Sequence, residues 1–126
     1  MRIFITAPFG DNKENIEKLR SIIKSTGFED YCFAMDEGRI EDPKELMIRA
    51  EEEIKKSDVL LIDITYKPTG RLIEAGMAYA LKKKIIVIMK KGTLAKETVI
   101  GIADIIIEYE KTDDIKMGLE DFYNKI

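Results

Sequence analysis

A single carboxylate interrupts an otherwise apolar segment, and it is the residue best placed to do chemistry. Residues 72–81 would pass for a buried helix but for Glu74. An ionised side chain without a partner costs several kcal/mol to remove from water. The field at a helix N-terminus or pairing with Arg71 would explain the residue structurally. Its apolar neighbours Ile73 and Ala75 favour instead a catalytic acid or nucleophile.

The composition excludes several other kinds of chemistry. The sequence has no histidine and one cysteine, Cys32, so histidine catalysis, an internal disulfide and paired-cysteine zinc sites are ruled out. A net charge of −3, with Lys and Glu scattered, gives no sign of a surface for nucleic acid polymers or membranes. We expect no metal, because histidine and paired cysteines are missing, and no cofactor, because dinucleotide and Walker sequences are missing. Without a signal peptide or a membrane-spanning run, the chain is predicted to be a soluble cytoplasmic protein.

The elements that must position Glu74 follow from the apolar pattern. Runs rich in Ile and Val predict strands buried on both faces at residues 2–6, 58–63, 84–89 and 103–109, and residues 30–35 are a weaker strand candidate. Helices are predicted over residues 12–25, 42–54, 69–82 and 94–100, with a last helix behind a Thr112 cap. The second of these should begin at an Asp42 cap.

Strands that alternate with helices predict an α/β fold. We expect one doubly wound, flavodoxin-like or Rossmann-like domain over residues 1–126, with a five-stranded parallel sheet flanked by helices. Such sheets bind ligands at the carboxyl ends of their strands. Glu74 lies one turn inside the helix that follows residues 58–63, so it should stand at this edge.

The segment SDVLLIDITYKPTGRLIEAGMAYALKKKIIVI, residues 57–88, resembles the nucleoside 2-deoxyribosyltransferase superfamily, including its 2'-deoxynucleoside 5'-monophosphate N-glycosidase branch. The shared pattern is Ser-Asp before an apolar strand, then Gly-x-x-x-Glu-x-Gly-x-Ala and a Lys-rich turn. RIFITAPFG is similar to the family's first strand. The resemblance implies an enzyme that cleaves or transfers at an N-glycosidic bond, with Glu74 as the nucleophile.

The second carboxylate of the resemblance is harder to place. The family usually has an Asp eight residues before the Asp of Ser-Asp, and Ala50 stands at that position. Glu51 or Glu53 could reach the crevice through a shift of helix register. Asp63, at the carboxyl end of the strand predicted over residues 58–63, is the other candidate. It could instead be a loop cap with a purely structural role.

The remaining predicted site residues would bind substrate. The resemblance places Phe9 against a nucleobase, although a structural Phe is an equal alternative, and Gly10 could offer backbone amides to an anion. Lys67 and Arg71 flank a turn that could cradle a 5'-phosphate or be an ordinary solvated loop. The predicted substrate-binding residues are Thr6, Pro8, Phe9, Gly10, Lys67, Thr69, Gly70 and Arg71.

Three functional classes follow from these residues. The first is cleavage or transfer at the N-glycosidic bond of a 2'-deoxynucleoside or its 5'-monophosphate. The second is a Toll/interleukin-receptor-like NAD nucleosidase, and the third is a non-catalytic nucleotide-binding sensor, which Ala50 favours. The expected partner is a small nucleoside or nucleotide, and the resemblance implies a homodimer or a larger homo-oligomer.

Overall fold

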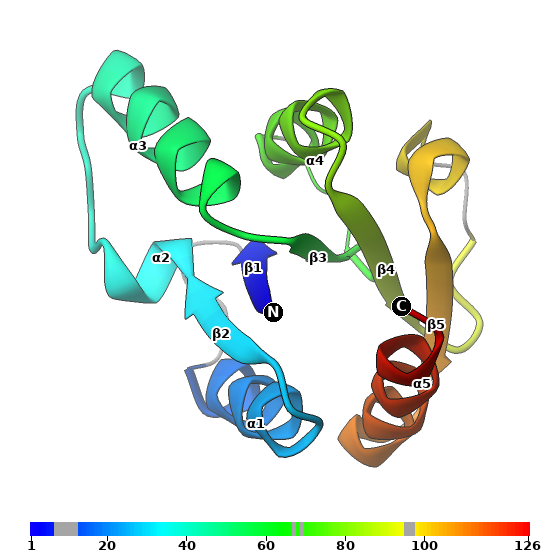
Figure 1. Ribbon diagram of the computed structural model, residues 1–126. Coiled ribbons are helices and arrows are strands. Elements are labelled where there is room, and N and C mark those ends of the chain that lie inside the picture. The colour runs from blue at the N-terminus through cyan, green and yellow to red at the C-terminus, as the bar shows by residue number, and fades with distance from the viewer. Residues whose placement is uncertain (7–12, 67, 69, 95–97) are drawn as a thin grey trace.

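A five-stranded parallel sheet forms the centre of the computed structural model (Figure 1), which describes residues 1–6, 13–66, 68, 70–94 and 98–126. The strands lie in the order β2-β1-β3-β4-β5, and every neighbouring pair is parallel. They are β1 Arg2–Thr6, β2 Glu29–Cys32, β3 Val59–Asp63, β4 Lys84–Lys90 and β5 Ile105–Tyr109. This is the flavodoxin-like order, so the predicted fold class is confirmed.

Helices cover both faces of the sheet. In Figure 1, α1 and α5 lie below the sheet, and α3 and α4 lie above it. The helices are α1 Lys13–Ser25, α2 Phe33–Asp36, α3 Pro43–Lys55, α4 Arg71–Ala80 and α5 Thr112–Lys125, with a 3₁₀ helix η1 at Thr98–Ile102. The helix predicted over residues 94–100 corresponds to η1, and residues 95–97 lie outside the described residues.

The apolar runs form strands because side chains alternate between two buried faces. Ile3 and Ile5 of β1 pack with α1 and α5, whereas Phe4 packs on the side of α3 and α4. Leu61 and Leu60 of β3 divide in the same way. A strand between two helical layers needs apolar residues at successive positions, and this explains the Ile-rich and Val-rich runs.

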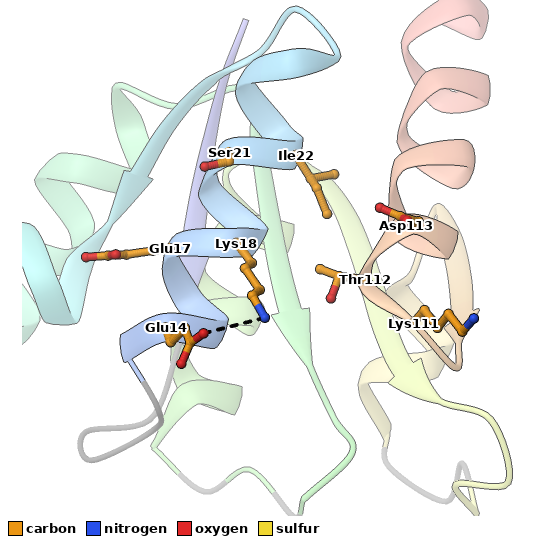
Figure 2. Close-up of a pocket in the computed structure, with 8 residues that line it drawn as sticks. All are labelled: Glu14, Glu17, Lys18, Ser21, Ile22, Lys111, Thr112 and Asp113. Atoms are coloured by element: carbon orange, nitrogen blue, oxygen red, sulfur yellow. Dashed lines mark ion pairs between the residues drawn. The ribbon is translucent and has the colours of Figure 1, made fainter.

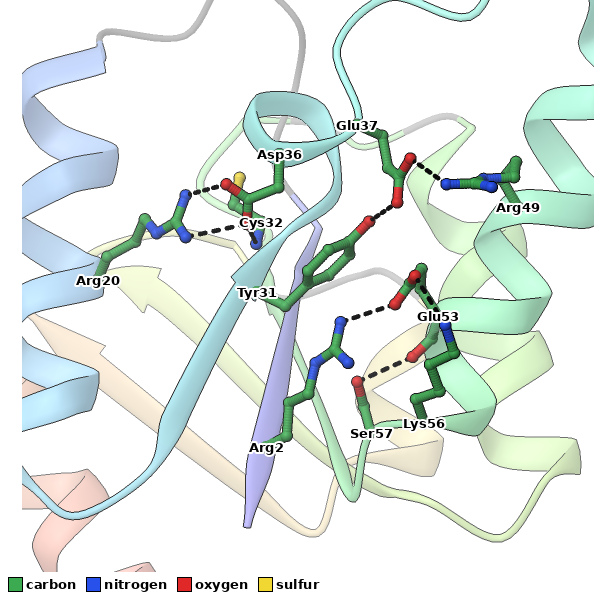
Figure 3. A network of polar contacts seen from close by, with 10 residues as sticks. All are labelled: Arg2, Arg20, Tyr31, Cys32, Asp36, Glu37, Arg49, Glu53, Lys56 and Ser57. Carbon is green, nitrogen blue, oxygen red and sulfur yellow. Dashed lines mark hydrogen bonds and ion pairs between the residues drawn. The ribbon is translucent and has the colours of Figure 1, made fainter.

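The second predicted strand ends earlier than its sequence indicates. Residues 33–35 were expected to continue it, but Phe33 begins the short helix α2. The Asp36 carboxylate accepts a hydrogen bond from the Cys32 backbone N–H at 3.0 Å, and Arg20 forms an ion pair with Asp36 at 2.9 Å (Figure 3). These polar contacts turn the chain at a position where its residue types favour continued strand.

The predicted helix starts are confirmed at α3 and corrected at α5. Asp42 caps α3, because its carboxylate accepts a hydrogen bond from the Lys44 N–H at 3.3 Å. Thr112 was expected to cap the last helix, yet it is the first residue of α5. The carboxylate of Asp114 takes the capping role by accepting the backbone N–H groups of Glu110 and Lys111.

Two helical glycines, one in α5 and one in α4, differ in the space around them. A Cβ at Gly118 would lie 2.6 Å from Cδ1 and 2.7 Å from Cγ1 of Ile107. We expect Gly118→Ala to lower the free energy of unfolding by about 1–3 kcal/mol through overpacking. At Gly76 in α4 a Cβ meets no atom within 4 Å, so Gly76→Ala should raise it by about 0.5–1 kcal/mol. Urea unfolding measures both, and equal effects would contradict the packing argument.

Candidate active site

A cavity of about 290 Å³ opens at the carboxyl edge of the sheet, between the strand ends and the helices α1 and α5. This volume is close to the lower end of the range for small-molecule sites, about 300–1,000 Å³. The floor is aliphatic and consists of Ile5, Ile16, Leu19, Leu61, Ile88 and Ile115. Polar and aromatic residues surround it, among them Thr6, Asp63, Tyr66, Arg71, Lys90 and Tyr109.

Glu74 lies in the first turn of α4, beside the cavity rather than in its lining. Burial raises the pKa of its carboxyl group from 4.5 to about 7, while the neighbouring Thr6 hydroxyl and the Arg71 guanidinium act to lower it. The residue as a whole is of intermediate exposure, so the desolvation concerns mainly its carboxylate. A group of this pKa gains and loses its proton near neutral pH, and perturbed carboxyl groups of this kind are common in active sites.

Thr6 connects Glu74 with the cavity. It is the last residue of β1, only 2% of its surface is exposed, and it lines the cavity. Among the described residues its Oγ1 has no hydrogen bond of normal geometry, so its approach to the Glu74 carboxylate falls short of one. A buried hydroxyl at this position can donate a hydrogen bond to the Glu74 carboxylate or to a bound ligand.

Asp63 ties together the ends of three strands. Its Oδ1 accepts hydrogen bonds from the Thr65 backbone N–H at 2.9 Å and from the Thr65 hydroxyl at 2.6 Å, and its Oδ2 accepts the Tyr109 hydroxyl at 2.5 Å. The Lys90 N–H donates to Thr65 Oγ1 at 2.9 Å. The bond to the Thr65 N–H makes Asp63 a loop cap, and its carboxylate at the same time faces the cavity in a fixed orientation.

The start of α4 is attached to the end of β3. Arg71 Nη1 donates a hydrogen bond to the Asp63 carbonyl oxygen at 2.9 Å. Arg71 also lines the cavity and lies three positions before Glu74, so this bond holds a cation near both the cavity and the carboxylate.

Of the predicted site residues, the structure brings together Glu74, Asp63, Thr6 and Arg71 at one edge. Gly70 precedes α4 at its cap position and is exposed. The other predicted residues lie outside the described residues; they are Pro8, Phe9, Gly10, Lys67 and Thr69.

The idea that a register shift brings Glu51 or Glu53 to the crevice is wrong. Glu53 is buried and pairs with Arg2 at 2.7 Å, at the amino end of β1 (Figure 3). Glu51 pairs with Lys55 on the surface at 3.5 Å. Helix α3 runs back from the carboxyl edge toward the amino edge, so its last turns are far from Glu74. Ala50, at the position of the family's Asp, is 1% exposed in the core.

Four further residues at this edge were not predicted from the sequence: Tyr109, Lys90, Thr65 and Tyr66. Tyr109 and Lys90 are the last residues of β5 and β4, so their position at a carboxyl strand end was an available signal. No local pattern links Asp63 with Tyr109, because 46 positions separate them.

A second depression lies between α1 and the start of α5 (Figure 2), with a volume of about 580 Å³. Charged side chains of both signs surround it, and Lys18 pairs there with Glu14 at 3.7 Å. Ile22 is its one large apolar lining residue among those described. Although larger than the cavity beside Glu74, it lacks an apolar floor, so we regard it as a surface groove.

The described part of the chain also bears on other kinds of site. No group of three or more Cys, Asp or Glu side chains there is arranged to hold a metal ion. None of the helices described is both long and apolar enough to cross a lipid bilayer.

Comparison with solved structures shows a shared fold. The CMP N-glycosidase BcmB of Clostridium botulinum has a TM-score of 0.73 and 22% sequence identity, over 98% of this chain and 99% of that chain. A 2-deoxyribosyltransferase of Bacillus psychrosaccharolyticus has a TM-score of 0.73 and 17% identity, over 92% and 90%. BlsM, known from a solution structure, has a TM-score of 0.76 and 18% identity, over 98% and 90%.

Sequence comparison adds no closer relative. No model of a protein family matches the sequence, and a search of curated proteins finds no match. The structural neighbours therefore confirm the fold that the resemblance to the nucleoside 2-deoxyribosyltransferase superfamily implied. A shared fold does not determine chemistry, which must be argued from the site.

The raised pKa of Glu74 predicts a pH-dependent effect of Glu74→Gln on stability. Below pH 4.5 the carboxyl is protonated in both states, so the substitution should be nearly neutral. Between pH 4.5 and about 7 the unfolded chain gives up this proton while the native protein keeps it, so the wild type loses stability, and above about 7 the native protein holds an ionised buried group and the loss is complete. Glu74→Gln should therefore be more stable at pH 8.5, by at most about 3 kcal/mol.

Urea unfolding at pH 4, 6 and 8.5 measures this difference. The exposed Glu120→Gln serves as the matched control and should leave the pH curve of the wild type unchanged. A stabilisation by Glu74→Gln that is the same at all three pH values would show that the Glu74 carboxyl is not desolvated.

Proposed function

We propose that the protein is an enzyme that cleaves or transfers at the N-glycosidic bond of a 2'-deoxynucleoside or its 5'-monophosphate. The observation that carries the proposal is the desolvated carboxylate of Glu74, held beside a small-molecule cavity at the ligand edge of the sheet. Solved structures of this fold include a CMP N-glycosidase and a 2-deoxyribosyltransferase, which supports the assignment.

Glu74 is proposed to act as the nucleophile. Breaking an N-glycosidic bond builds positive charge on the sugar, and an ionised carboxylate in a poorly hydrated site stabilises that charge strongly. Its oxygen can then form a bond to the anomeric carbon while the bonding electrons leave with the base. Water next attacks the same carbon, which breaks the bond to Glu74 and restores its carboxylate, and the released proton passes to the second carboxylate or to solvent; the product is the free sugar. When a second base attacks in place of water, the product is a new nucleoside or nucleotide.

Asp63 is proposed as the second carboxylate. Its hydrogen bonds to Thr65 and Tyr109 fix its orientation at the cavity. From there it would orient the substrate or assist proton transfer to the leaving base, in place of the Asp that Ala50 replaces. A substrate with a 5'-phosphate is favoured by Arg71, whose guanidinium lines the cavity next to the start of α4.

A nucleotide-binding sensor is the second candidate function. The observation that favours it is Ala50, which is fully packed in the core where the resemblance calls for a catalytic Asp. A sensor would keep the cavity and bind a nucleotide without releasing its base.

Base release from a panel of compounds tests the proposed activity. The panel comprises 2'-deoxynucleosides, their 5'-monophosphates, ribonucleotides and NAD. We expect release from the deoxy compounds and a fall of about 10²–10⁴-fold in Glu74→Gln, as for loss of a group that takes part in bond breaking. As a nucleophile, Glu74 must be ionised, so kcat/KM should rise with pH through about 7.

The controls separate the candidate functions. Glu120→Gln, an exposed substitution, should keep the activity of the wild type. Binding of a deoxynucleotide without base release would support the sensor, and release from NAD alone would support the NAD nucleosidase. A kcat/KM that falls with pH through about 7 would make Glu74 a proton donor instead of a nucleophile.

A homodimer is proposed on the outward face of α4. Between residues 71 and 82 Glu74 is the one charged residue, and it is directed inward. Ile73 and Tyr79 are 59% and 56% exposed. An apolar helix face of this kind is typical of an interface, and the resemblance implies a second copy as the partner.

Substitutions on this face test the dimer. We expect the wild type to sediment as a dimer in analytical ultracentrifugation, and Ile73→Glu or Tyr79→Glu to sediment as monomers, because a charge would be buried without a partner. Met117→Glu is the matched control, since Met117 is 69% exposed on α5, and it should leave the dimer intact. A dimer that survives both α4 substitutions would place the interface elsewhere.

A further inference from the structure

Tyr66 is an aromatic residue with little contact to the rest of the chain. It follows β3, lines the cavity beside Glu74, and leaves 74% of its surface exposed. Lys90 Nζ lies 5.9 Å from the centre of its ring, which is within cation–π range. An aromatic ring at the mouth of an apolar cavity gains contact area when a flat molecule covers it.

The floor of the cavity defines what can lie beneath Tyr66. All six floor side chains are aliphatic, and Ile5, Leu61 and Ile88 among them are at most 1% exposed. Such a floor disfavours an anionic group, whose desolvation would cost several kcal/mol. Cations of Arg71 and Lys90 are placed around the cavity, so an anionic substituent would remain near them while an uncharged ring enters.

The position of Thr6 indicates how a ligand would be oriented in the cavity. Its buried hydroxyl is without a hydrogen bond of normal geometry among the described residues, lines the cavity, and lies beside the Glu74 carboxylate. A ring in the cavity would therefore have its point of attachment to a sugar next to Thr6, with the sugar toward Glu74.

We propose that this cavity is the subsite for a planar heterocyclic ring and that Tyr66 stacks on the ring from the cavity mouth. The identification of the ring as the nucleobase of the substrate rests on the proposed function. The stack supplies most of the discrimination between base-containing ligands and a bare sugar phosphate, because every base offers a flat face to an aromatic side chain.

Calorimetric titration tests the stack in the Glu74→Gln background, in which the ligand stays intact. The ligands are 2'-deoxynucleoside 5'-monophosphates and 2-deoxyribose 5-phosphate, which lacks the base. Tyr66→Leu should lower the affinity for the nucleotides about 5- to 100-fold, the range for one base–aromatic stack. Tyr66→Phe keeps the ring and should bind like the parent, and neither substitution should change the affinity for the sugar phosphate.

Methyl NMR locates the ring independently of Tyr66. Binding of the nucleotide should shift the methyl signals of Ile16, Leu19 and Ile88 in the floor and leave that of Ile54, in the opposite core, unchanged. Shifts confined to other methyl groups would overturn the location of the subsite.

The outcomes distinguish this inference from the proposed function. Equal nucleotide affinity in Tyr66→Leu and Tyr66→Phe would overturn the stack, even if the wild type releases base. If Tyr66→Leu loses affinity equally for the nucleotide and for the sugar phosphate, the stack is overturned as well. If the nucleotide binds in the cavity and Tyr66→Leu lowers its affinity, but the wild type releases no base, the subsite is supported and the proposed enzymatic activity is contradicted. Absence of nucleotide binding would overturn the subsite.

Discussion

Removal of the Glu74 carboxylate from water is the constraint on which the rest of the carboxyl edge depends. Burial raises the proton affinity of this group, and the Thr6 hydroxyl and the Arg71 guanidinium oppose the effect only in part. Arg71 is held by the Asp63 carbonyl, and Asp63 in turn by Tyr109. A protein selected only for stability would place a neutral residue at position 74, so the arrangement favours a functional role.

The sequence predicts most of the fold because each central strand has to be apolar on two faces. The prediction fails where polar groups that are distant in the sequence determine the conformation of the backbone. Phe33 leaves the strand pattern because Asp36 and Arg20 bind there, and the residue types of 33–35 contain no sign of this. Glu74 was identifiable as one charge in an apolar helix. Tyr109 was not, since its contact with Asp63 spans 46 positions.

Asp63 has a structural contact that still leaves its carboxylate at the cavity. Its contact with the Thr65 N–H is the loop cap that a structural explanation predicts, and its carboxylate still lines the cavity. Helix α3 directs Glu51 and Glu53 away from the cavity. They form ion pairs with Lys55 and Arg2 instead. The shared fold of the neighbours fixes where a ligand edge lies, whereas such local contacts fix which groups face it.

Helix α4 presents Glu74 on one side and an apolar face with Ile73 and Tyr79 on the other. A rigid ten-residue helix cannot move one side without the other. A partner that covers the outer face and shifts α4 would therefore be linked to the proton and the ligand on the inner face, and binding free energies linked in this way are reciprocal. Self-association would tighten or loosen ligand binding by the same factor by which ligand changes self-association, and protein concentration would become a regulator of the site.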